Sequence, residues 1–279
     1  MIFISPAKIN RGFNVLKKRS DGFHDIETNF QFLEWGDEIT FNFDTSTSQV
    51  SCPEVKEKNN LAYKAIHLLK ETYKINKEVS LKIKKNIPIG SGLGGGSSNA
   101  ATVLHVLNKY WKLNLNNKVL KDLGSSLGSD VPIFIEGVAR KANGKGEIFS
   151  KTLLKEEIIF LVMPKCNIST AKAFQEIEIS DFKNSKNSKD FNFFEKWARK
   201  NYKEVDDSFI WLESIKKGNL TGTGSALYAI FNSFEEASKI IDNAPKNNNY
   251  FVTRSLNESP LLKELNKNWG VAKRKGSGF

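Results

Sequence analysis

A run of glycines between Pro88 and Ala101 constrains this chain more than any other feature. It reads Pro-Ile-Gly-Ser-Gly-Leu-Gly-Gly-Gly-Ser-Ser-Asn-Ala-Ala, with five glycines in seven positions. Glycine has no Cβ atom, so such a backbone can adopt positive φ angles repeatedly and turn successive N–H groups toward one point. We therefore predict a loop that holds a chain of phosphates.

The elements expected on either side of the glycines fit this purpose. Apolar and polar residues alternate over 79–84, which predicts a half-buried strand. Apolar residues recur at helical spacing over 98–111, which predicts a helix with Ser97 or Ser98 as its N-cap. The first turn of a helix adds unpaired N–H groups and the positive end of the helix dipole. A flexible linker would not lead into a capped amphipathic helix.

Two familiar phosphate loops are excluded by the residues around this one. The spacing Gly90-x-Gly92-x-x-Gly95 matches a dinucleotide-binding loop, but that design needs an acidic residue about 20 positions later. No Asp or Glu occurs between Glu78 and Asp122. A P-loop needs a lysine directly after its last glycine, and this chain has Ser97 there.

The remaining pattern, Pro-x-x-x-Gly-Leu-Gly-x-x-Ser-Ser-x-Ala-Ala, resembles the second motif of the GHMP kinases. Segments 5–43, 127–137 and 220–231 carry the same resemblance, which spans most of the chain and thins after about residue 165. It implies an α+β, two-domain GHMP kinase fold with the active site in the cleft between the domains. The cofactors implied are ATP and Mg²⁺. By the same resemblance, the ATP-binding residues are Pro88, Gly90, Gly92, Leu93, Gly94, Gly95, Gly96, Ser97, Ser98 and Asn99.

The resemblance also supplies two catalytic candidates. Lys8 lies in Pro-Ala-Lys-Ile-Asn, which is similar to the first family motif; without that match it would be an ordinary surface lysine. The match implies that Lys8 lies beside the transferred phosphate. Asp130 lies in Gly-Ser-Asp-Val-Pro, where an aspartate could equally bond the backbone of a turn. The match implies that Asp130 is the general base.

Magnesium ligands are harder to identify. Ser97 or Ser98 could offer a hydroxyl at the start of the helix, although either could instead cap that helix. We predict Ser98 as the metal ligand.

The form of the glycine loop is most similar to one branch of the family. That branch phosphorylates the 2-hydroxyl of a cytidine-diphosphate-linked methylerythritol in non-mevalonate isoprenoid precursor biosynthesis. That branch commonly has Gly-Tyr-His here, and its last two residues contact the cytosine; in this chain Phe23 and His24 occupy those two positions. Phe23 keeps a face for stacking but lacks the hydroxyl, and a neutral histidine can hydrogen-bond a base edge.

Other substrate contacts follow from the same resemblance. Asn10 would lie near the acceptor, and Phe174 is either a second wall for the base or a core residue of a helix. The segment 220–226 resembles the last family motif, with threonine in place of a commoner serine. Its predicted substrate-binding residues are Thr221, Gly222, Thr223 and Gly224.

The composition adds weaker constraints. Lys and Arg number 42 against 31 Asp and Glu, a net charge of +11. Because the lysines are scattered, we expect a small anionic substrate and no nucleic-acid partner. Cys52 and Cys166 suit neither a disulfide framework nor a zinc site. Lys8 and Arg11 interrupt the apolar start, and the longest apolar run, 158–163, is too short to span a bilayer. We expect a cytoplasmic monomer or weak homodimer without membrane association.

The order of the expected elements predicts two domains, an ATP-binding domain over 1–150 and a substrate-side domain over 151–279. An exposed loop is expected over 183–190, and a capping box opens a helix at Ser233. The expected strands are 2–5, 10–17, 27–32, 37–43, 79–84, 131–136, 158–163 and 226–231, with a hairpin over 139–149. The expected helices include 60–73, 98–111 and 117–127.

Three other functions stay open at this point. The chain could be another GHMP kinase that acts on homoserine or a mevalonate derivative. It could be a nucleotide-responsive binding protein that lost catalysis, although the presence of both Lys8 and Asp130 argues against that. The net charge also leaves an RNA-binding module open.

Overall fold

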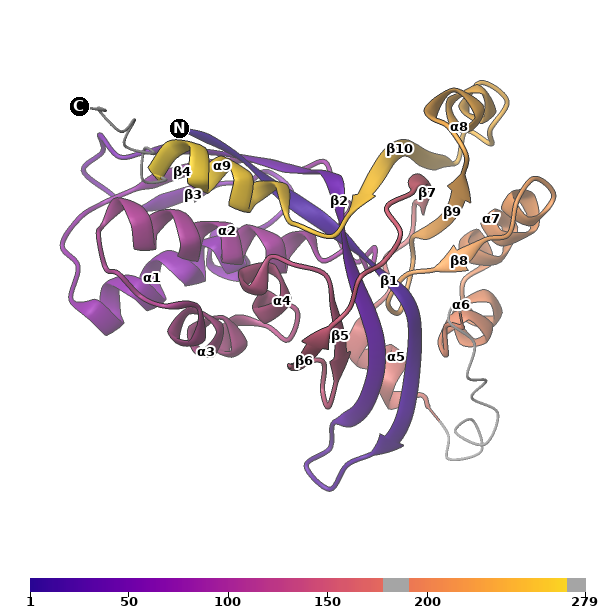
Figure 1. Ribbon diagram of the computed structural model, residues 1–279, viewed down its shortest axis with the longest axis horizontal. Coiled ribbons are helices and arrows are strands. Elements are labelled where there is room, and N and C mark those ends of the chain that lie inside the picture. Colours follow the sequence, from indigo (N-terminus) through magenta and orange to yellow (C-terminus); the bar gives the residue numbers. More distant parts are fainter. Residues whose placement is uncertain (178–190, 270–279) are drawn as a thin grey trace, which may run out of the picture.

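The computed structural model describes residues 1–177 and 191–269 (Figure 1). The strands are β1 (Ile2–Lys18), β2 (His24–Asn42), β3 (Gln49–Ser51), β4 (Ser80–Lys84), β5 (Arg140–Asn143), β6 (Ile148–Lys151), β7 (Ile158–Pro164), β8 (Asn219–Leu220), β9 (Leu227–Phe231) and β10 (Asn248–Leu256). The helices are α1 (Leu61–Tyr73), α2 (Gly95–Tyr110), α3 (Asn117–Leu127), α4 (Val131–Glu136), α5 (Thr170–Gln175), α6 (Glu195–Asn201), α7 (Lys203–Glu213), α8 (Phe234–Ile241) and α9 (Pro260–Trp269), with a 3-10 turn at Glu57–Asn59.

A long antiparallel hairpin of β1 and β2 runs through the molecule and connects its two lobes (Figure 1). The two strands pair as far as Lys18 opposite His24, with a register shift between Pro6 and Lys8. The sheet order is β3-β4-β2-β10-β7-β9-β8, and β1 and β5 also pair with β2. The sheet therefore continues from the first lobe to the second through β2 and β10.

The first lobe is organised around α2, the helix that follows the glycines. Helices α1, α3, α4 and α9 all contact α2, which also packs on β1 and β2. Its side chains are buried over most of its length. Helix α9 comes from the far end of the chain, and its Leu261 and Leu265 are buried in the same core. A helix enclosed in this way holds the glycine loop at a fixed place.

The second lobe packs helices α7 and α8 against β7, β9 and β10, with α6 beside α7 (Figure 1). Its core includes Phe160 and Phe209, and Phe13 from the long hairpin joins it. A third apolar cluster lies between the lobes, where Ile9 of β1 and Leu93 of the glycine loop pack with residues of β7 and β9. The glycine loop is thus anchored on its apolar side by the junction of the lobes.

Most of the expected elements are confirmed, and the α+β class with them. Residues 60–73, 98–111 and 117–127 are helical apart from residues at their ends, and the hairpin over 139–149 forms as β5 and β6. Ser233 caps α8 by accepting a hydrogen bond from the N–H of Glu236. The four short strands expected before residue 43 merge into β1 and β2. The loop expected over 183–190 lies outside the described residues.

Two local predictions are wrong. Residues 131–136 form helix α4 instead of a strand; Pro132 is tolerated in its first turn, and Gly137 ends it with a left-handed φ of 66°. Neither Ser97 nor Ser98 caps α2, because the helix begins earlier, after Gly94 with a φ of 77°. The boundary at residue 150 stays a prediction. No helix within residues 1–177 and 191–269 is long and apolar enough to cross a bilayer.

Candidate active site

A cavity of about 350 Å³ lies along the glycine loop and collects residues from both lobes. The predicted residues that line it are Lys8, Asn10, Pro88, Gly90, Gly92, Gly94, Gly95, Gly96, Ser97, Asn99, Asp130, Phe174, Gly222 and Thr223. Six predicted residues are not part of this lining, namely Leu93, Ser98, Phe23, His24, Thr221 and Gly224. Residues separated by more than 200 positions in the chain therefore share one cavity.

The glycine loop has the backbone that its sequence predicts. Gly90, Gly92 and Gly94 have φ angles of 68°, 78° and 77°. A Cβ atom at Gly94 would lie 2.8 Å from the ring of Phe134, and one at Gly92 would lie 2.4 Å from the carbonyl oxygen of Thr221. Side chains are therefore excluded at these positions by space as well as by φ.

The start of α2 leaves backbone donors available to an anion. Gly94 is the N-cap, and no side chain caps this end of the helix. Gly95, Gly96 and Ser97 form the first turn and line the cavity. N–H groups in a first turn have no partner within the helix, and the helix dipole adds partial positive charge there. The geometry suits a bound phosphate.

Lys8 and Asp130 form an ion pair at the edge of this loop. The Nζ atom of Lys8 lies 3.3 Å from Oδ2 of Asp130. The same ammonium donates to Oδ1 of Asn10 over 2.7 Å and to the carbonyl oxygen of Gly92 over 3.0 Å. Lys8 is only 3% exposed, so these contacts fix the position of its charge. The Asp130 side chain is 35% exposed and remains accessible from the cavity.

Asp130 owes its position to the start of α4. It is the N-cap residue of that helix, but its carboxylate makes no capping hydrogen bond. The carboxylate is therefore not used to complete the turn, which was the alternative role that its sequence context allowed. In the chain, Lys8 lies before the glycine loop and Asp130 lies after it.

The loop at 221–224 contacts β1, and the residues that follow it contact the glycine loop. The hydroxyl of Thr221 accepts a hydrogen bond from the backbone N–H of Asn10 over 3.0 Å. The N–H of Ala226 donates to the carbonyl oxygen of Ser91 over 3.0 Å. Thr221, where the family more often has serine, thus uses its hydroxyl to hold β1, and the backbone after it holds the glycine loop.

Aromatic side chains gather around Phe174, which lines the cavity. The rings of His24 and Phe174 lie 5.2 Å apart between centroids. Phe174 lines the cavity, and His24 is not part of the lining. Burial, and secondarily the charge of Lys18, lowers the pKa of His24. Phe23 is 58% exposed, and the ammonium of Lys145 lies 4.7 Å from its ring centroid. The structure therefore brings His24 and Phe174 together and leaves Phe23 on the outer rim.

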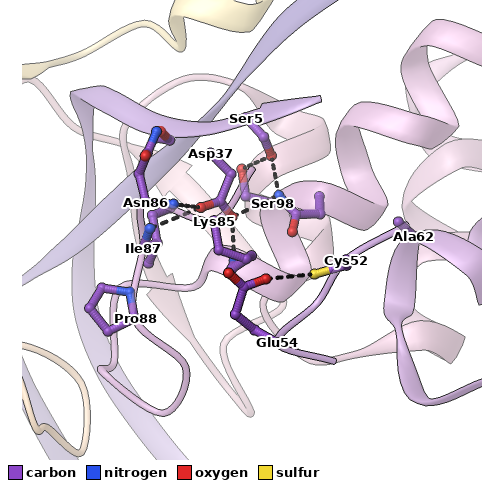
Figure 2. Close-up of polar contacts among 12 residues, drawn as sticks. Ser5, Asp37, Cys52, Glu54, Ala62, Lys85, Asn86, Ile87, Pro88 and Ser98 are labelled. Carbon is purple, nitrogen blue, oxygen red and sulfur yellow. Dashed lines mark hydrogen bonds and ion pairs between the residues drawn. The ribbon is translucent and has the colours of Figure 1, made fainter. Parts of the chain in front are cut away.

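Ser98 is buried, and its hydroxyl takes part in a hydrogen bond that the sequence did not indicate. Its hydroxyl oxygen accepts from the hydroxyl of Ser5 over 2.9 Å (Figure 2), and the residue is 1% exposed. The hydroxyl-bearing neighbour Ser97 lines the cavity instead. Within the described part of the chain, no group of three or more His, Cys, Asp or Glu residues could hold a metal ion. Ser98 as a magnesium ligand stays a prediction.

Asp37, Lys85 and Lys145 were missed by the sequence analysis. Lys85 and Lys145 line the cavity, and Asp37 is fully buried beside the loop (Figure 2). The chain has 42 basic residues, so nothing in the sequence separates these two lysines from the rest. Asp37 follows Gly36 in the middle of β2, and a buried carboxylate there has no local signature.

Comparisons with known proteins agree with this geometry. Family models described as GHMP kinases N terminal domain and GHMP kinases C terminal match residues 60–138 and 170–249. The chain is 35% identical to the 4-diphosphocytidyl-2-C-methyl-D-erythritol kinase of Hahella chejuensis (strain KCTC 2396), covering 95% of this chain and 96% of that protein. It is 38% identical to the enzyme of the same name from Aliivibrio fischeri (strain MJ11), covering 94% of each.

Solved structures give the same result. A crystal structure of 4-(cytidine 5'-diphospho)-2C-methyl-D-erythritol kinase matches with a TM-score of 0.82 and 25% identity, over 91% of this chain and 99% of that chain. A mevalonate kinase shares the fold, with a TM-score of 0.65 and 15% identity over 92% of this chain and 100% of that chain. The chain is therefore a small-molecule kinase with the two-domain α+β fold, and it belongs to the GHMP kinase family.

Proposed function

We propose that this kinase transfers the γ-phosphate of ATP to the 2-hydroxyl of 4-diphosphocytidyl-2-C-methyl-D-erythritol, a step of non-mevalonate isoprenoid precursor biosynthesis. The names of its relatives support this substrate. The observation that carries the mechanism is the 3.3 Å contact between Lys8 Nζ and Asp130 Oδ2 at the edge of the glycine loop. A cation and a base beside a phosphate cradle are the groups that phosphoryl transfer requires.

In the proposed reaction, Asp130 accepts the proton of the 2-hydroxyl as that oxygen attacks the γ-phosphorus. The bond between the γ-phosphorus and the oxygen bridging to the β-phosphate breaks, and ADP leaves. Lys8 stabilises the negative charge that develops on the transferred group, since its ammonium is held by Asn10 and Gly92. The N–H groups of the glycine loop and of the first turn of α2 bind the phosphates of ATP.

The donor set of this site fits Mg²⁺, which neutralises phosphate charge when it is bound. Mg²⁺ binds oxygen ligands, and in nucleotide sites the phosphates and water supply several of them. Because Asp130 serves as the base, a hydroxyl in the first turn of α2 would supply the protein oxygen, and the nucleotide phosphates and water would supply the others. Ser98 is the predicted donor of that hydroxyl, and Ser97 lies on the cavity side of the same turn.

The acceptor would occupy the end of the cavity near Asn10 and Phe174. Stacking on Phe174 and a hydrogen bond from neutral His24 would recognise the cytosine, with Phe23 at the rim. Asn10 and the loop of Thr221, Gly222, Thr223 and Gly224 would orient the methylerythritol part toward Asp130. We further propose a cytoplasmic enzyme that acts as a monomer or weak homodimer on a small-molecule substrate, without nucleic-acid or membrane partners.

A comparison of three acceptors tests the substrate. Purified protein, MgCl₂ and ATP labelled in the γ-phosphate are incubated separately with 4-diphosphocytidyl-2-C-methyl-D-erythritol, homoserine and mevalonate. We expect labelled product from the first acceptor alone, with a kcat/KM at least about 10³ times that of the others. Efficient labelling of homoserine or mevalonate, or no product with any acceptor, would contradict the proposal.

A further inference from the structure

The carboxylate of Asp37 contacts the chain on both sides of the glycine loop. Its Oδ1 atom accepts hydrogen bonds from the backbone N–H groups of Asn86, over 2.8 Å, and Ile87, over 2.9 Å (Figure 2). Its Oδ2 atom accepts a hydrogen bond of 3.0 Å from the side-chain amide of Asn99 and forms an ion pair with Lys85. Asn86 and Ile87 directly precede the loop at 88–94, and Asn99 lies in the second turn of α2, the helix that follows the loop.

The close packing of β2 against β1 holds Asp37 in place. It is 0% exposed and lies in β2 opposite Ser5 of β1. The preceding residue, Gly36, lies so close to β1 that a Cβ atom there would be 2.0 Å from the carbonyl oxygen of Ser5. Asn86 returns a second bond, from its side-chain amide to the carbonyl oxygen of Gly36 over 2.8 Å. The carboxylate therefore lies where β1 and β2 approach each other closely.

All the acceptor sites of the carboxylate are used. An ionised carboxylate offers about four lone-pair directions, and here four donors fill them. The ion pair with Lys85 compensates the buried charge, which would otherwise be expensive. Lys85 lines the cavity, and its ammonium lies 2.9 Å from where a Cβ atom of Gly95 would be. The network thus reaches the residue at which α2 begins.

A loop with five glycines has many conformations, and few of them bring its N–H groups together. Fixing its two ends to one buried group reduces that number before the ligand arrives. When only a fraction of the protein is in the binding-competent conformation, the apparent dissociation constant rises by the reciprocal of that fraction. An anchor that raises the competent fraction tenfold therefore tightens binding tenfold.

We propose that Asp37 is a positioning residue that clamps both ends of the glycine loop and so sets the affinity for the triphosphate of ATP. This inference rests on the proposed function, because it assumes that the loop binds ATP. It predicts a selective effect. Loss of the clamp weakens ATP binding and leaves binding of the acceptor, whose proposed contacts are Asn10 and Phe174, unchanged.

The first test substitutes Asp37→Asn. The asparagine carbonyl can still accept from Asn86 and Ile87, but its NH₂ group faces two other donors, Lys85 and Asn99. We expect the KM for ATP and the dissociation constant of a non-hydrolysable ATP analogue to rise about tenfold, with the KM for the acceptor within twofold of wild type. Glu78→Gln is the matched control, because Glu78 pairs with Lys70 away from the cavity; it should change neither KM.

A reciprocal exchange separates positioning from general stability. In the double variant D37N/N99D, the asparagine at 37 can donate to the carboxylate at 99, which also restores a charge partner for Lys85. We expect this variant to recover most of the ATP affinity lost in Asp37→Asn. The milder Asn99→Ala keeps the Asp37 carboxylate but removes the amide's hydrogen bonds to Asp37 and Ser5, and should raise the KM for ATP about threefold.

Two results would overturn the clamp. One is an Asp37→Asn enzyme whose affinity for the ATP analogue equals that of wild type. The other is a joint rise of both KM values that the reciprocal exchange does not reverse, since a generally destabilised enzyme behaves in that way. If the wild-type protein binds no ATP analogue, the proposed function fails as well. If it binds the analogue and only the variants behave unexpectedly, the clamp alone fails.

Discussion

The backbone N–H of Lys8 donates a hydrogen bond to the carbonyl oxygen of Leu93 over 3.0 Å. This bond joins β1 to the glycine loop, and the side chain of Leu93 is buried between the lobes next to Ile9. The lysine is therefore fixed to the loop by its backbone and, through the contact of its ammonium with Gly92, by its side chain. One strand and one loop set the position of the charge relative to the phosphate cradle.

A substitution at Gly94 tests the backbone of this cradle. Gly94→Ala forces an alanine to a φ of 77° with its Cβ atom 2.8 Å from the ring of Phe134, so we expect the free energy of unfolding to fall by about 1–3 kcal/mol. Urea titration measures this change. Gly96→Ala is the matched control for stability, because the nearest atom to its Cβ is 3.7 Å away. Equal stability of the two variants would contradict the assigned loop geometry.

A substitution at His24 tests acceptor recognition. We expect His24→Ala to raise the KM for the cytidylyl acceptor about tenfold, because one good hydrogen bond and a ring contact are lost. The KM for ATP should not change. His67→Ala, on α1, is the control and should affect neither KM. Because burial lowers the pKa of His24, the ring stays neutral at pH 7, and acceptor binding should weaken only as pH falls below 6.5. Acceptor binding that strengthens in acid would contradict this role.

The buried ring of His105 predicts a pH dependence of stability. Burial lowers the pKa of His105 to about 4, while its Nε2 contacts the carbonyl oxygen of Ile135 in α4 over 3.2 Å. The unfolded chain takes up a proton near pH 6.5, whereas the folded protein does not until about pH 4. The contribution of His105 to the free energy of unfolding is complete above pH 6.5. It falls by about 3 kcal/mol as the pH drops to 4.

The measurement compares the free energy of unfolding of wild type and His105→Gln between pH 7 and pH 4. Glutamine does not titrate and can still donate to Ile135, so the stability of the variant should depend less steeply on pH. Identical pH profiles would show that His105 does not titrate in this way.

Local patterns predicted the parts of the site that are continuous in the chain. The strand before the glycines and the helix after them follow from residue spacing over 79–84 and 98–111. The family motifs around Lys8 and Asp130 identified two residues that the structure brings to 3.3 Å. The N-cap was misassigned because serines 97 and 98 have a strong capping preference, while the left-handed φ of Gly94 has no separate signature among so many glycines.

Contacts between distant residues could not be predicted from local pattern. Asp37 accepts a hydrogen bond from Asn99, which lies 62 positions later in the chain, and the ring of His24 contacts that of Phe174, which lies 150 positions later. Only the folded chain brings these residues together. The apolar run at 131–136 is typical of a strand, but packing against α2 and α3 makes it a helix. Tertiary context decides such short segments.

The most direct test of the account is the turnover of Asp130→Asn. Asparagine keeps the size of the side chain but cannot take up the hydroxyl proton, so kcat should fall about 10³-fold. The dissociation constant of an ATP analogue should stay within threefold of wild type, and Asp122→Asn, an exposed residue of α3, should leave kcat unchanged. If Asp130→Asn turned over at nearly the wild-type rate, the general base and the mechanism built on it would be wrong.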